Sequence, residues 1–558
     1  MRVRSLIHNM KYFYISILLF FLALPMAAQE GEVDMTWYRS GNKEFVLTTE
    51  AQMRGLSELV AGGNDFLGKT VYIHKDIDVS NSIWTPIGSS EAPFAGTFDG
   101  SGYRVCLGRI AHAEYGGLFG FVNGNVKNLN VSVKDAQDSL TNAGVIAGFV
   151  GKTASVKFCS TFGLFQLKNA SVVGGLVGIT EGEIESCANN CRLVNDNAKA
   201  NAMGGIAGVA AGIIAKCHNT ACLLATNVCG GIVGKNNEMN ADLSIWNSFN
   251  IGDVQVVSKQ GDGEDAIAGG VVGNAENQDM QQCYNCGRVS VYSFKSEGDI
   301  HCRSYAGGLV GIGSGKLVAS YNIGDVVSRS AADVADKIES VSYVYAGGLL
   351  GCQRGTGFTS LSYCYNAGFV YAYGMGGNHT FVNYGGILGD FSSFAPSLKS
   401  CYYLDENCKS EIGHGSVNDT FYKNIGFGVR EDELTSVKFI QKNKEVPGLN
   451  DEEVYSYDDD NINMGYPVCA MVHTLGIERQ GDKAVLKAVS NASVASKGFF
   501  YWIGGLEDYT VDMPATQDFE CTLDMPQKGE DCYVQAYVIL HDGTMKKGNV
   551  LKMHIPNF

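Results

Sequence analysis

Short hydrophobic runs recur along most of the chain, and glycine interrupts each run before it reaches the length of a helix. The recurring unit contains the pentapeptide Gly-Gly-aliphatic-X-Gly. It occurs at 116–120, 174–178, 204–208, 230–234, 269–273, 307–311, 347–351 and 385–389. A ninth copy, at 144–148, has Val145 in the second glycine slot. Repetition of this kind predicts one structural unit that is stacked many times.

A second element follows most copies of the pentapeptide. It occurs as Cys283–Gly287, Ser320–Gly324 and Cys364–Gly368, and a short β-branched run such as Val326-Val327 comes next. Glycine and asparagine suit corners because they tolerate a positive φ angle or the close approach of another backbone. We expect a positive φ at slots such as Gly308 and Gly348, so that valine there would be strained. The unit is therefore predicted as short strand, corner, short strand, corner.

Strands this short cannot bury a hydrophobic face by themselves, so stacked coils must provide the core. The third residue of each copy is aliphatic and is predicted to line that core: Leu118, Ile146, Leu176, Ile206, Ile232, Val271, Leu309, Leu349 and Ile387. The fold class predicted is all-β, a parallel β-solenoid (β-helix) of about nine repeats.

Both ends of the array differ from its middle. Residues 49–61 place Met53, Leu56 and Val60 on one helical face, which predicts a short helical N-terminal cap that Gly62-Gly63 ends; residues 71–79 read as a strand. From about residue 473 the glycine motif stops and alternating runs predict a small antiparallel β-sandwich. The predicted organisation is a cap with the first coils at 29–110, the repeat array at 111–410, a closing segment at 411–472 and the sandwich at 473–558.

Residues 1–28 read as a signal peptide. Arg2, Arg4 and Lys11 precede the apolar run 12–24, and small residues follow it. The first translated residue is Met1 or Met10. No second hydrophobic span follows, so we expect no transmembrane segment after its removal. The predicted location is the cell surface, the extracellular space or the periplasm.

These motifs resemble the GLUG repeat, which occurs in arrays on exported bacterial surface proteins. The resemblance covers roughly residues 84–467: Trp84–Gly88 is similar to the usual opening segment, and 401–404 and 463–468 are similar to closing elements. It implies surface exposure and an adhesive or binding role, and it supplies no catalytic residues. Tyr533–Val538, followed by Asp542-Gly543, resembles the late strands of fibronectin type III-like modules.

The amino-acid composition limits the classes of partner that the protein is expected to bind. The chain has 558 residues with 42 Lys+Arg against 58 Asp+Glu, a net charge of −16, which argues against nucleic acid as a partner. Glycans or host and cell-surface proteins are the expected partners.

Of the 17 cysteines, six recur at one phase of the repeat, so we predict an internal ladder of reduced thiols: Cys159, Cys187, Cys217, Cys283, Cys364 and Cys401. Cys283 and Cys286 both fall within the repeat pattern, and no metal or cofactor is expected.

Catalytic chemistry is not predicted. None of the 10 histidines lies in a His-Glu-x-x-His motif. Because parallel β-helices include polysaccharide-degrading enzymes, the carboxylates Asp76, Asp78 and 458–460 keep that alternative open; a solvated edge and a solvated or calcium-binding loop are the plainer interpretations. A third alternative is a passive stalk that presents the C-terminal sandwich.

Tyrosine marks the second half of the array. Residues 116–283 contain none, whereas 284–403 contain 13. In parallel, the interval between the last glycines of successive copies rises from 26–30 to 38–40 residues, and the extra residues lie at 255–266, 291–303, 328–341 and 371–382. Insertions at one phase of a solenoid lie on one face, so we expect these four side by side. They supply the candidate ligand contacts Tyr292, Phe294, His301, Tyr371, Tyr373 and His379, whereas Tyr284, Tyr321 and Tyr365 are predicted to stack as a structural ladder.

Overall fold

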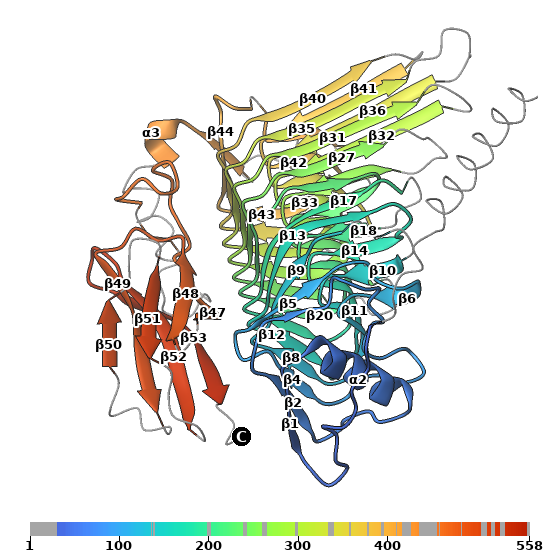
Figure 1. Cartoon of the computed structure of the whole chain (residues 1–558). Helices are drawn as coiled ribbons and strands as arrows, with labels where there is room; N and C mark the ends of the chain where they lie inside the picture. The colour runs from blue at the N-terminus through green and yellow to red at the C-terminus, as the bar shows by residue number, and fades with distance from the viewer. Residues whose placement is uncertain are drawn as a thin grey trace, which may run out of the picture.

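The computed structural model describes residues 31–554 except 136, 138–139, 198–201, 238–242, 259–264, 296–299, 333–339, 356–358, 376–378, 392–395, 409, 416–425, 435–454, 457, 481–482, 504–510, 515–518 and 525–529. The predicted signal peptide, residues 1–28, lies outside the described residues. As predicted, the protein is a parallel β-solenoid followed by a small antiparallel β-sandwich (Figure 1).

Three sets of parallel strands form the solenoid. The first, called sheet 1 here, has nine strands, and its members are β6 (Ala113–Gly116), β10 (Leu140–Gly144), β14 (Val172–Gly174), β18 (Ala202–Gly204), β23 (Val228–Gly230), β28 (Ala266–Gly269), β32 (Ile300–Gly307), β36 (Ser340–Gly347) and β41 (His379–Gly385). Every one of these strands ends at the first glycine of a Gly-Gly-aliphatic-X-Gly copy. The repeat found in the sequence is therefore the repeat of the fold.

Sheet 2 begins where each motif ends, because its strands start at the fourth motif residue. Most coils contribute two consecutive segments to it. Its members are β1 (Glu44–Leu47), β2 (Thr70–Ile73), β4 (Thr97–Asp99), β7 (Phe119–Val122), β8 (Asn125–Lys127), β11 (Ala147–Val150), β12 (Ser155–Lys157), β15 (Val177–Thr180), β16 (Glu183–Glu185), β19 (Ala207–Ala210), β20 (Gly212–Ala215), β24 (Val233–Asn236), β25 (Leu243–Trp246), β29 (Val272–Gln281), β33 (Val310–Val318), β37 (Leu350–Gln353), β38 (Ser360–Ser362), β42 (Leu388–Phe391), β43 (Ser397–Lys399) and β45 (Ile412–Gly415). The aliphatic third residue of each motif sits at this corner and is fully buried.

Sheet 3 completes each coil. Its members are β3 (Ile77–Asp78), β5 (Arg104–Leu107), β9 (Asn130–Val133), β13 (Ser160–Leu167), β17 (Ala188–Asn195), β21 (His218–Asn219), β22 (Leu223–Ala225), β26 (Phe249–Asn250), β27 (Val254–Ser258), β30 (Tyr284–Asn285), β31 (Val289–Lys295), β34 (Tyr321–Asn322), β35 (Val326–Ala332), β39 (Tyr365–Asn366), β40 (Val370–Met375), β44 (Cys401–Leu404) and β46 (Gly426–Val429). The short strands that carry the Tyr-Asn pairs stack in register, Tyr284 on Tyr321 and Tyr321 on Tyr365.

The motif glycines are required by close packing, and the expectation of a positive φ at these slots is wrong. None of the glycines in the nine copies has a left-handed φ. Instead, a Cβ atom built on Gly347 would lie 1.8 Å from the carbonyl oxygen of Leu350, and one on Gly308 would lie 2.0 Å from that of Gly348. At this corner the backbone of the same coil and the backbone of the next coil both lie so close that there is no room for a side chain.

A left-handed backbone does occur at the corner between sheets 2 and 3, on residues that are not glycine. One residue per coil has φ between 47° and 58°, and these residues are Asn128, Phe158, Ser186, Lys216, Asn247, Gln282, Ala319, Tyr363 and Ser400. We call them the corner column. Their side chains share no chemistry, so the sequence carries no signal for this corner.

A buried asparagine ladder runs next to the glycine corner. The Nδ2 atom of each asparagine donates to Oδ1 of the asparagine in the next coil at 2.7–2.8 Å, through Asn189, Asn219, Asn250, Asn285, Asn322 and Asn366. All six are fully buried. Thr161 occupies the equivalent position one coil earlier, in register with Asn189, in the coil whose second glycine slot holds Val145.

The predicted tyrosine ladder is present and is longer than expected. His218, Phe249, Tyr284, Tyr321 and Tyr365 stack with centroid separations of 4.7–5.0 Å and nearly parallel rings. The predicted cysteines lie in one column of the coils, in which Ser248 and Ser320 take the place of cysteine in two coils. Each of the six Sγ atoms faces the carbonyl oxygen two residues earlier at 3.2–3.6 Å, and each residue is a free, buried thiol.

The N-terminal cap is the predicted helix, α2 (Glu50–Ala61). Thr49 caps its N-terminus by accepting a hydrogen bond from the backbone N–H of Gln52, and Gly62 caps its C-terminus. Met53, Leu56 and Val60 join the core of the solenoid. The helix lies against the first coils (Figure 1).

The C-terminal sandwich consists of two antiparallel sheets. One has β47 (Val472–Gln480), β48 (Lys483–Ser490) and β51 (Glu520–Asp524); the other has β50 (Val511–Pro514), β49 (Ser496–Ile503), β52 (Asp531–Ile539) and β53 (Met545–His554). Residues of both sheets share one core. A short helix, α3 (Glu431–Leu434), precedes the sandwich.

The sandwich packs along the side of the array (Figure 1). Tyr284, Tyr321 and Tyr365 of the aromatic ladder form one apolar cluster with Tyr466 and Met471, which lead into the sandwich. Farther along the array, Arg104 pairs with Glu478 at 3.0 Å, and Nε of Arg479 donates to the carbonyl oxygen of Ser101. The aromatic ladder is thus an internal docking surface.

Candidate functional site

The insertions of the second half of the array form a projecting wall, which we call the flange. It consists of β31, β35 and β40 of sheet 3 and β32, β36 and β41 of sheet 1. These strands extend beyond the body of the solenoid at the upper right of Figure 1. Residues 259–264, 296–299, 333–339 and 376–378 of the four insertions lie outside the described residues.

The expectation that the four insertions lie side by side is confirmed. On sheet 3, Val257 pairs with Tyr292, Tyr292 with Arg329, and Arg329 with Tyr373. On sheet 1, His301 pairs with Val341, and Val341 with His379. The insertions therefore extend the sheets by hydrogen-bonded strands that keep the register of the coils.

Small side chains hold the two layers of the flange together. Oγ of Ser328 on sheet 3 donates to Oγ of Ser304 on sheet 1 at 2.9 Å, and Cys302 packs against Ala332. All four residues are buried. Since side chains alternate along a strand, the residues between them face outward on the two opposite surfaces of the wall.

Four of the six predicted contact residues lie on the sheet 3 surface. Tyr292 and Phe294 face outward from β31, and Tyr371 and Tyr373 from β40. Phe369, which immediately precedes β40, and Met375, at the end of β40, extend the row. We call this set the aromatic face. Tyr292, Tyr371 and Tyr373 are 40%, 37% and 45% exposed, unlike the ladder tyrosines.

The rings of the aromatic face are nearly parallel. The centroids of Phe369, just before β40, and Tyr371 are 6.2 Å apart with planes at 16°, and those of Tyr371 and Tyr373 on β40 are 6.4 Å apart at 9°. Tyr292 and Phe294 lie 6.5 Å apart at 6°. Arg329 is exposed between Tyr292 and Tyr373. The result is an exposed, mostly apolar strip that includes the cationic side chain of Arg329.

The other two predicted residues, His301 and His379, lie on the opposite, sheet 1 surface. There, His301 contacts Tyr343, which stacks on Phe381 with centroids 5.2 Å apart. The guanidinium of Arg303 lies over the Tyr343 ring. The structure therefore separates the six predicted residues into two groups that cannot contact one small ligand together.

A charged cluster lies at the base of the sheet 1 surface. Asp265 pairs with Arg354 at 2.9 Å and with Arg303 at 3.6 Å, and Arg354 lies over the ring of Tyr305 and bonds to its hydroxyl. Burial, followed by the charge of Asp265, raises the pKa of Tyr305 above its usual range. Every charge in this cluster has an opposite partner.

The carboxylates considered for catalysis form hydrogen bonds that stabilise nearby turns and loops. Partial burial raises the pKa of Asp78, but hydrogen bonds from Lys134 and Ser80 outweigh it and hold the value at about 2. Asp76 accepts the backbone N–H of Arg104. Asp458 accepts backbone N–H groups of 462, 463 and 465, which organises a loop. Among the described residues, no three His, Cys, Asp or Glu side chains converge as metal ligands would.

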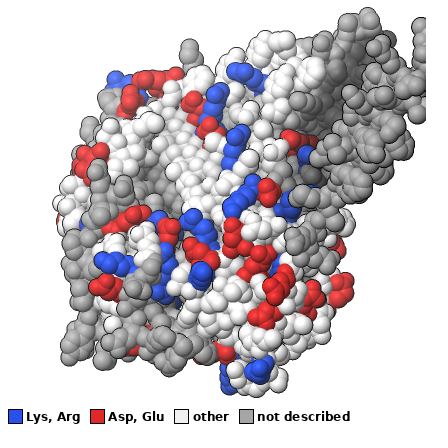
Figure 2. Space-filling view, viewed as in Figure 1, with Lys and Arg blue, Asp and Glu red and all other residues white. Residues whose placement is uncertain are grey.

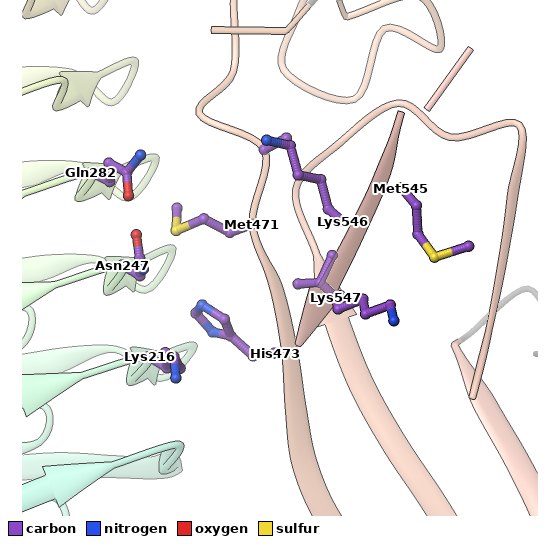
Figure 3. A pocket seen from close by; sticks show the side chains of 10 residues that line it. Lys216, Asn247, Gln282, Met471, His473, Met545, Lys546 and Lys547 are labelled. Carbon is purple, nitrogen blue, oxygen red and sulfur yellow. The ribbon is translucent and has the colours of Figure 1, made fainter. Parts of the chain in front are cut away.

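Sequence reasoning missed two cavities between the solenoid and the sandwich. The larger, of about 420 Å³, is lined by Lys216, Asn247 and Gln282 of the corner column and, from the sandwich side, by residues 470–473 and 545–547 (Figure 3). The smaller, of about 240 Å³, includes His218, Phe158 and Lys487. A cavity between segments more than 180 residues apart in the chain has no local sequence signature.

Charge is unevenly distributed over the surface. In Figure 2, side chains of both signs gather across the middle of the visible face, and a broad area of the upper array carries few charges. No helix among the described residues is long and apolar enough to cross a membrane.

Comparison of the chain with protein-family models, with curated proteins and with solved structures gave no match.

Proposed function

We propose that this protein is a non-enzymatic, exported surface β-solenoid that binds a glycan through the aromatic face of its flange. Export is supported by the signal-peptide pattern of residues 1–28, and the surface role by the resemblance of the repeats to the GLUG motif. The resemblance of the C-terminal sandwich to fibronectin type III-like modules also supports an exported surface protein.

The aromatic face carries the proposal. Phe369, Tyr371 and Tyr373 present three rings with nearly parallel planes along β40 and the residue before it, and the pairing of β40 with β35 fixes their spacing. The apolar faces of sugar rings pack on flat aromatic rings, and tyrosine adds a hydroxyl that can donate to a sugar oxygen. Rigid aromatic side chains lose little entropy on binding. A strip of this kind suits an extended saccharide better than a compact one.

The position of the sandwich favours binding over the stalk alternative. As a stalk, the array would hold the sandwich away from the cell surface, whereas the sandwich here lies along the side of the array and covers the aromatic ladder. Among the described residues of the second half of the array, the exposed large aromatic side chains all belong to the flange or adjoin it. None of the carboxylate contacts described above favours the polysaccharide-degrading alternative.

The experiment is an array of glycans and cell-surface proteins probed with the wild-type protein and with a Tyr371→Ala/Tyr373→Ala variant. We expect binding to one class of glycan that the double variant loses, because each ring contributes roughly 1–2 kcal/mol at a contact. Phe381→Ala, on the opposite surface of the flange, is the matched control and should bind normally. Binding to a protein in place of any glycan, or glycan binding that the double variant retains, would contradict the proposal.

A further inference from the structure

Arg329 gives the aromatic face its positive charge. The register of β35 places it directly between Tyr292 of β31 and Tyr373 of β40. Its side chain is exposed, and among the described residues no carboxylate, carbonyl oxygen or aromatic ring contacts its guanidinium. On the opposite surface of the flange, by contrast, Arg303 pairs with Asp265. The aromatic face therefore presents an open guanidinium beside two exposed rings.

The strand residues of this face include no carboxylate. Side chains alternate along a strand, so the outward positions of β27, β31, β35 and β40 are those in phase with Tyr292, Arg329 and Tyr373. Arg329 is the only charged residue at these outward positions of the four strands as described. The whole chain carries a net charge of −16, so a strip without acids around a cation is a local exception.

Two carboxylates, those of Asp253 and Asp325, lie on the same surface at the base of the flange. Asp253 accepts the backbone N–H of Arg288 in the next coil at 3.0 Å, and Asp325 likewise accepts that of Phe369 at 3.4 Å. Asp325 precedes Arg329 by four residues of extended chain, which is roughly 13 Å at about 3.3 Å per residue. Asp253 belongs to a coil two coils away. Both separations exceed the Debye length of about 8 Å at physiological salt, so neither acid neutralises Arg329.

From the open guanidinium, the rings on both sides of it and the strand positions without acids, we infer that the aromatic face binds an acidic glycan, an extended saccharide that contains uronic acid units. This inference rests on the function proposed above and specifies its ligand. A guanidinium offers two parallel N–H donors that match the two oxygens of a carboxylate. Rings of neutral sugars would leave these donors unused.

The geometry of a uronic acid suits this arrangement. Its carboxylate is attached directly to the sugar ring, so the two groups are held side by side. Neighbouring strands lie about 4.8 Å apart, so a sugar ring packed on Tyr373 or on Tyr292 places its carboxylate next to Arg329. The aromatic rings hold the saccharide, and the guanidinium selects the acidic one.

The test is a calorimetric titration of the full chain with tetrasaccharides of galacturonate, of mannuronate, and of glucuronate alternating with N-acetylglucosamine. The best binder is then compared with its methyl ester, which has the same rings without charge, and with tetraglutamate, which has charge without sugar rings. We expect at least one uronic acid oligomer to bind, its ester to bind at least about tenfold more weakly, and tetraglutamate not to bind. Added salt should weaken binding of the acid and leave that of the ester unchanged.

Substitutions of Arg329 assign the selectivity to one side chain. Arg329→Gln should weaken the acid at least about tenfold and leave the ester unchanged, because it removes a charge-assisted hydrogen bond and keeps the rings. Arg329→Lys keeps the charge without the two parallel donors, so it should retain only part of the affinity. The matched control is Arg192→Gln, which removes an exposed arginine of β17, on the same sheet but in the half of the array without the aromatic face. It should bind like the wild type.

Failure of this inference is distinguishable from failure of the proposed function. The inference alone is overturned if Tyr371→Ala/Tyr373→Ala abolishes glycan binding but the ester binds as tightly as the acid, or Arg329→Gln binds the acid like the wild type. Tight binding of tetraglutamate also overturns it, because charge attraction would then suffice without a saccharide. If none of the uronic acid oligomers and no glycan of the array binds, the inference and the proposed function both fail.

Discussion

A Cβ atom added to Gly348 would lie 2.4 Å from Cγ of Asn366, the last asparagine of the buried ladder. The same relationship recurs at Gly175 and Asn189, and at Gly308 and Asn322. The second motif glycine and the Tyr-Asn element are therefore one structural device: the glycine leaves the space that the asparagine ladder fills. Val145 is tolerated in the coil in which Thr161 replaces the asparagine.

Substitution of the motif glycines should destabilise the solenoid. Gly347→Val would force a side chain against the carbonyl oxygen of Leu350, and Gly348→Ala against Asn366. We expect each to lower the free energy of unfolding by at least about 2–3 kcal/mol, because a well-packed corner cannot absorb added volume. Thermal melting measures the loss. Gly41→Ala is the control, since a Cβ there meets no atom within 4 Å; equal melting of Gly347→Val and Gly41→Ala would refute the packing argument.

Interrupting the asparagine ladder should also lower the free energy of unfolding. Asn285 links Asn250 to Asn322, so Asn285→Ala leaves a donor on one neighbour and an acceptor on the other without their partner. The carbonyl oxygen of buried Gly287 also loses its hydrogen bond from Asn285, and the three groups together predict a loss of at least about 3 kcal/mol. Chemical denaturation of the full chain measures it. A smaller loss is expected for Thr161→Ala, at the end of the ladder, which has only one such bond; a larger loss there than at Asn285 would contradict the ladder.

Acidification should weaken the folded, docked state. Burial lowers the pKa of His218 to about 4; burial, and then the charges of His218 and Lys216, lower that of His473 to about 3. An exposed histidine titrates near 6.5. The unfolded or undocked chain thus binds more protons below about pH 6.5, so the stabilisation is complete above that pH and is lost as the pH falls toward 4.

Two substitutions measure how much the histidines contribute to the pH dependence of stability. His218→Phe keeps a ring in the aromatic ladder and should reduce the fall in melting temperature between pH 7 and pH 4.5, as should His473→Phe. Near this interface, burial raises the pKa of Glu185, but Lys216 and Lys157 outweigh it and hold that pKa below its usual value. The comparison is therefore the difference between variant and wild type. Identical pH profiles would show that neither histidine is buried at a docked interface.

Thiol reactivity should follow burial. Cys222 is exposed, whereas Cys187 and Cys217 are fully buried, and burial raises their pKa well above the usual value of a thiol. Because the thiolate is the reactive form, native protein treated with a thiol reagent should be labelled first at Cys222, and Cys222→Ser should lose that phase. Mass spectrometry identifies the labelled peptide. Rapid labelling of Cys187 in the native state would contradict the stacked ladder.

Repeats made much of the fold predictable. The nine glycine motifs located the nine strands of sheet 1, because a corner without side-chain space can be made only from glycine. The insertions were predictable as neighbouring strands because they recur at one phase of the repeat and successive coils stack in register. The aromatic and cysteine ladders followed from recurrence at one phase.

Other features depend on contacts that no local pattern encodes. The left-handed corner column accepts residues as different as Lys216 and Tyr363, so it has no signature. The sequence separates the ladder residue Tyr321 from the insertion residue Tyr292, but it does not show that the sandwich docks over the ladder. The division of His301 from Tyr292 between opposite surfaces arises because each insertion turns back on itself to build both layers of the flange.

The most direct test of the central claim is a crystal structure of the protein with the glycan that binds best on the array. The account predicts sugar rings packed on Tyr371 and Tyr373, with Arg329 beside them and the sheets of the flange unchanged. A glycan seated elsewhere, for example against Phe381 and His301 on the opposite surface, would contradict the assignment of binding to the aromatic face.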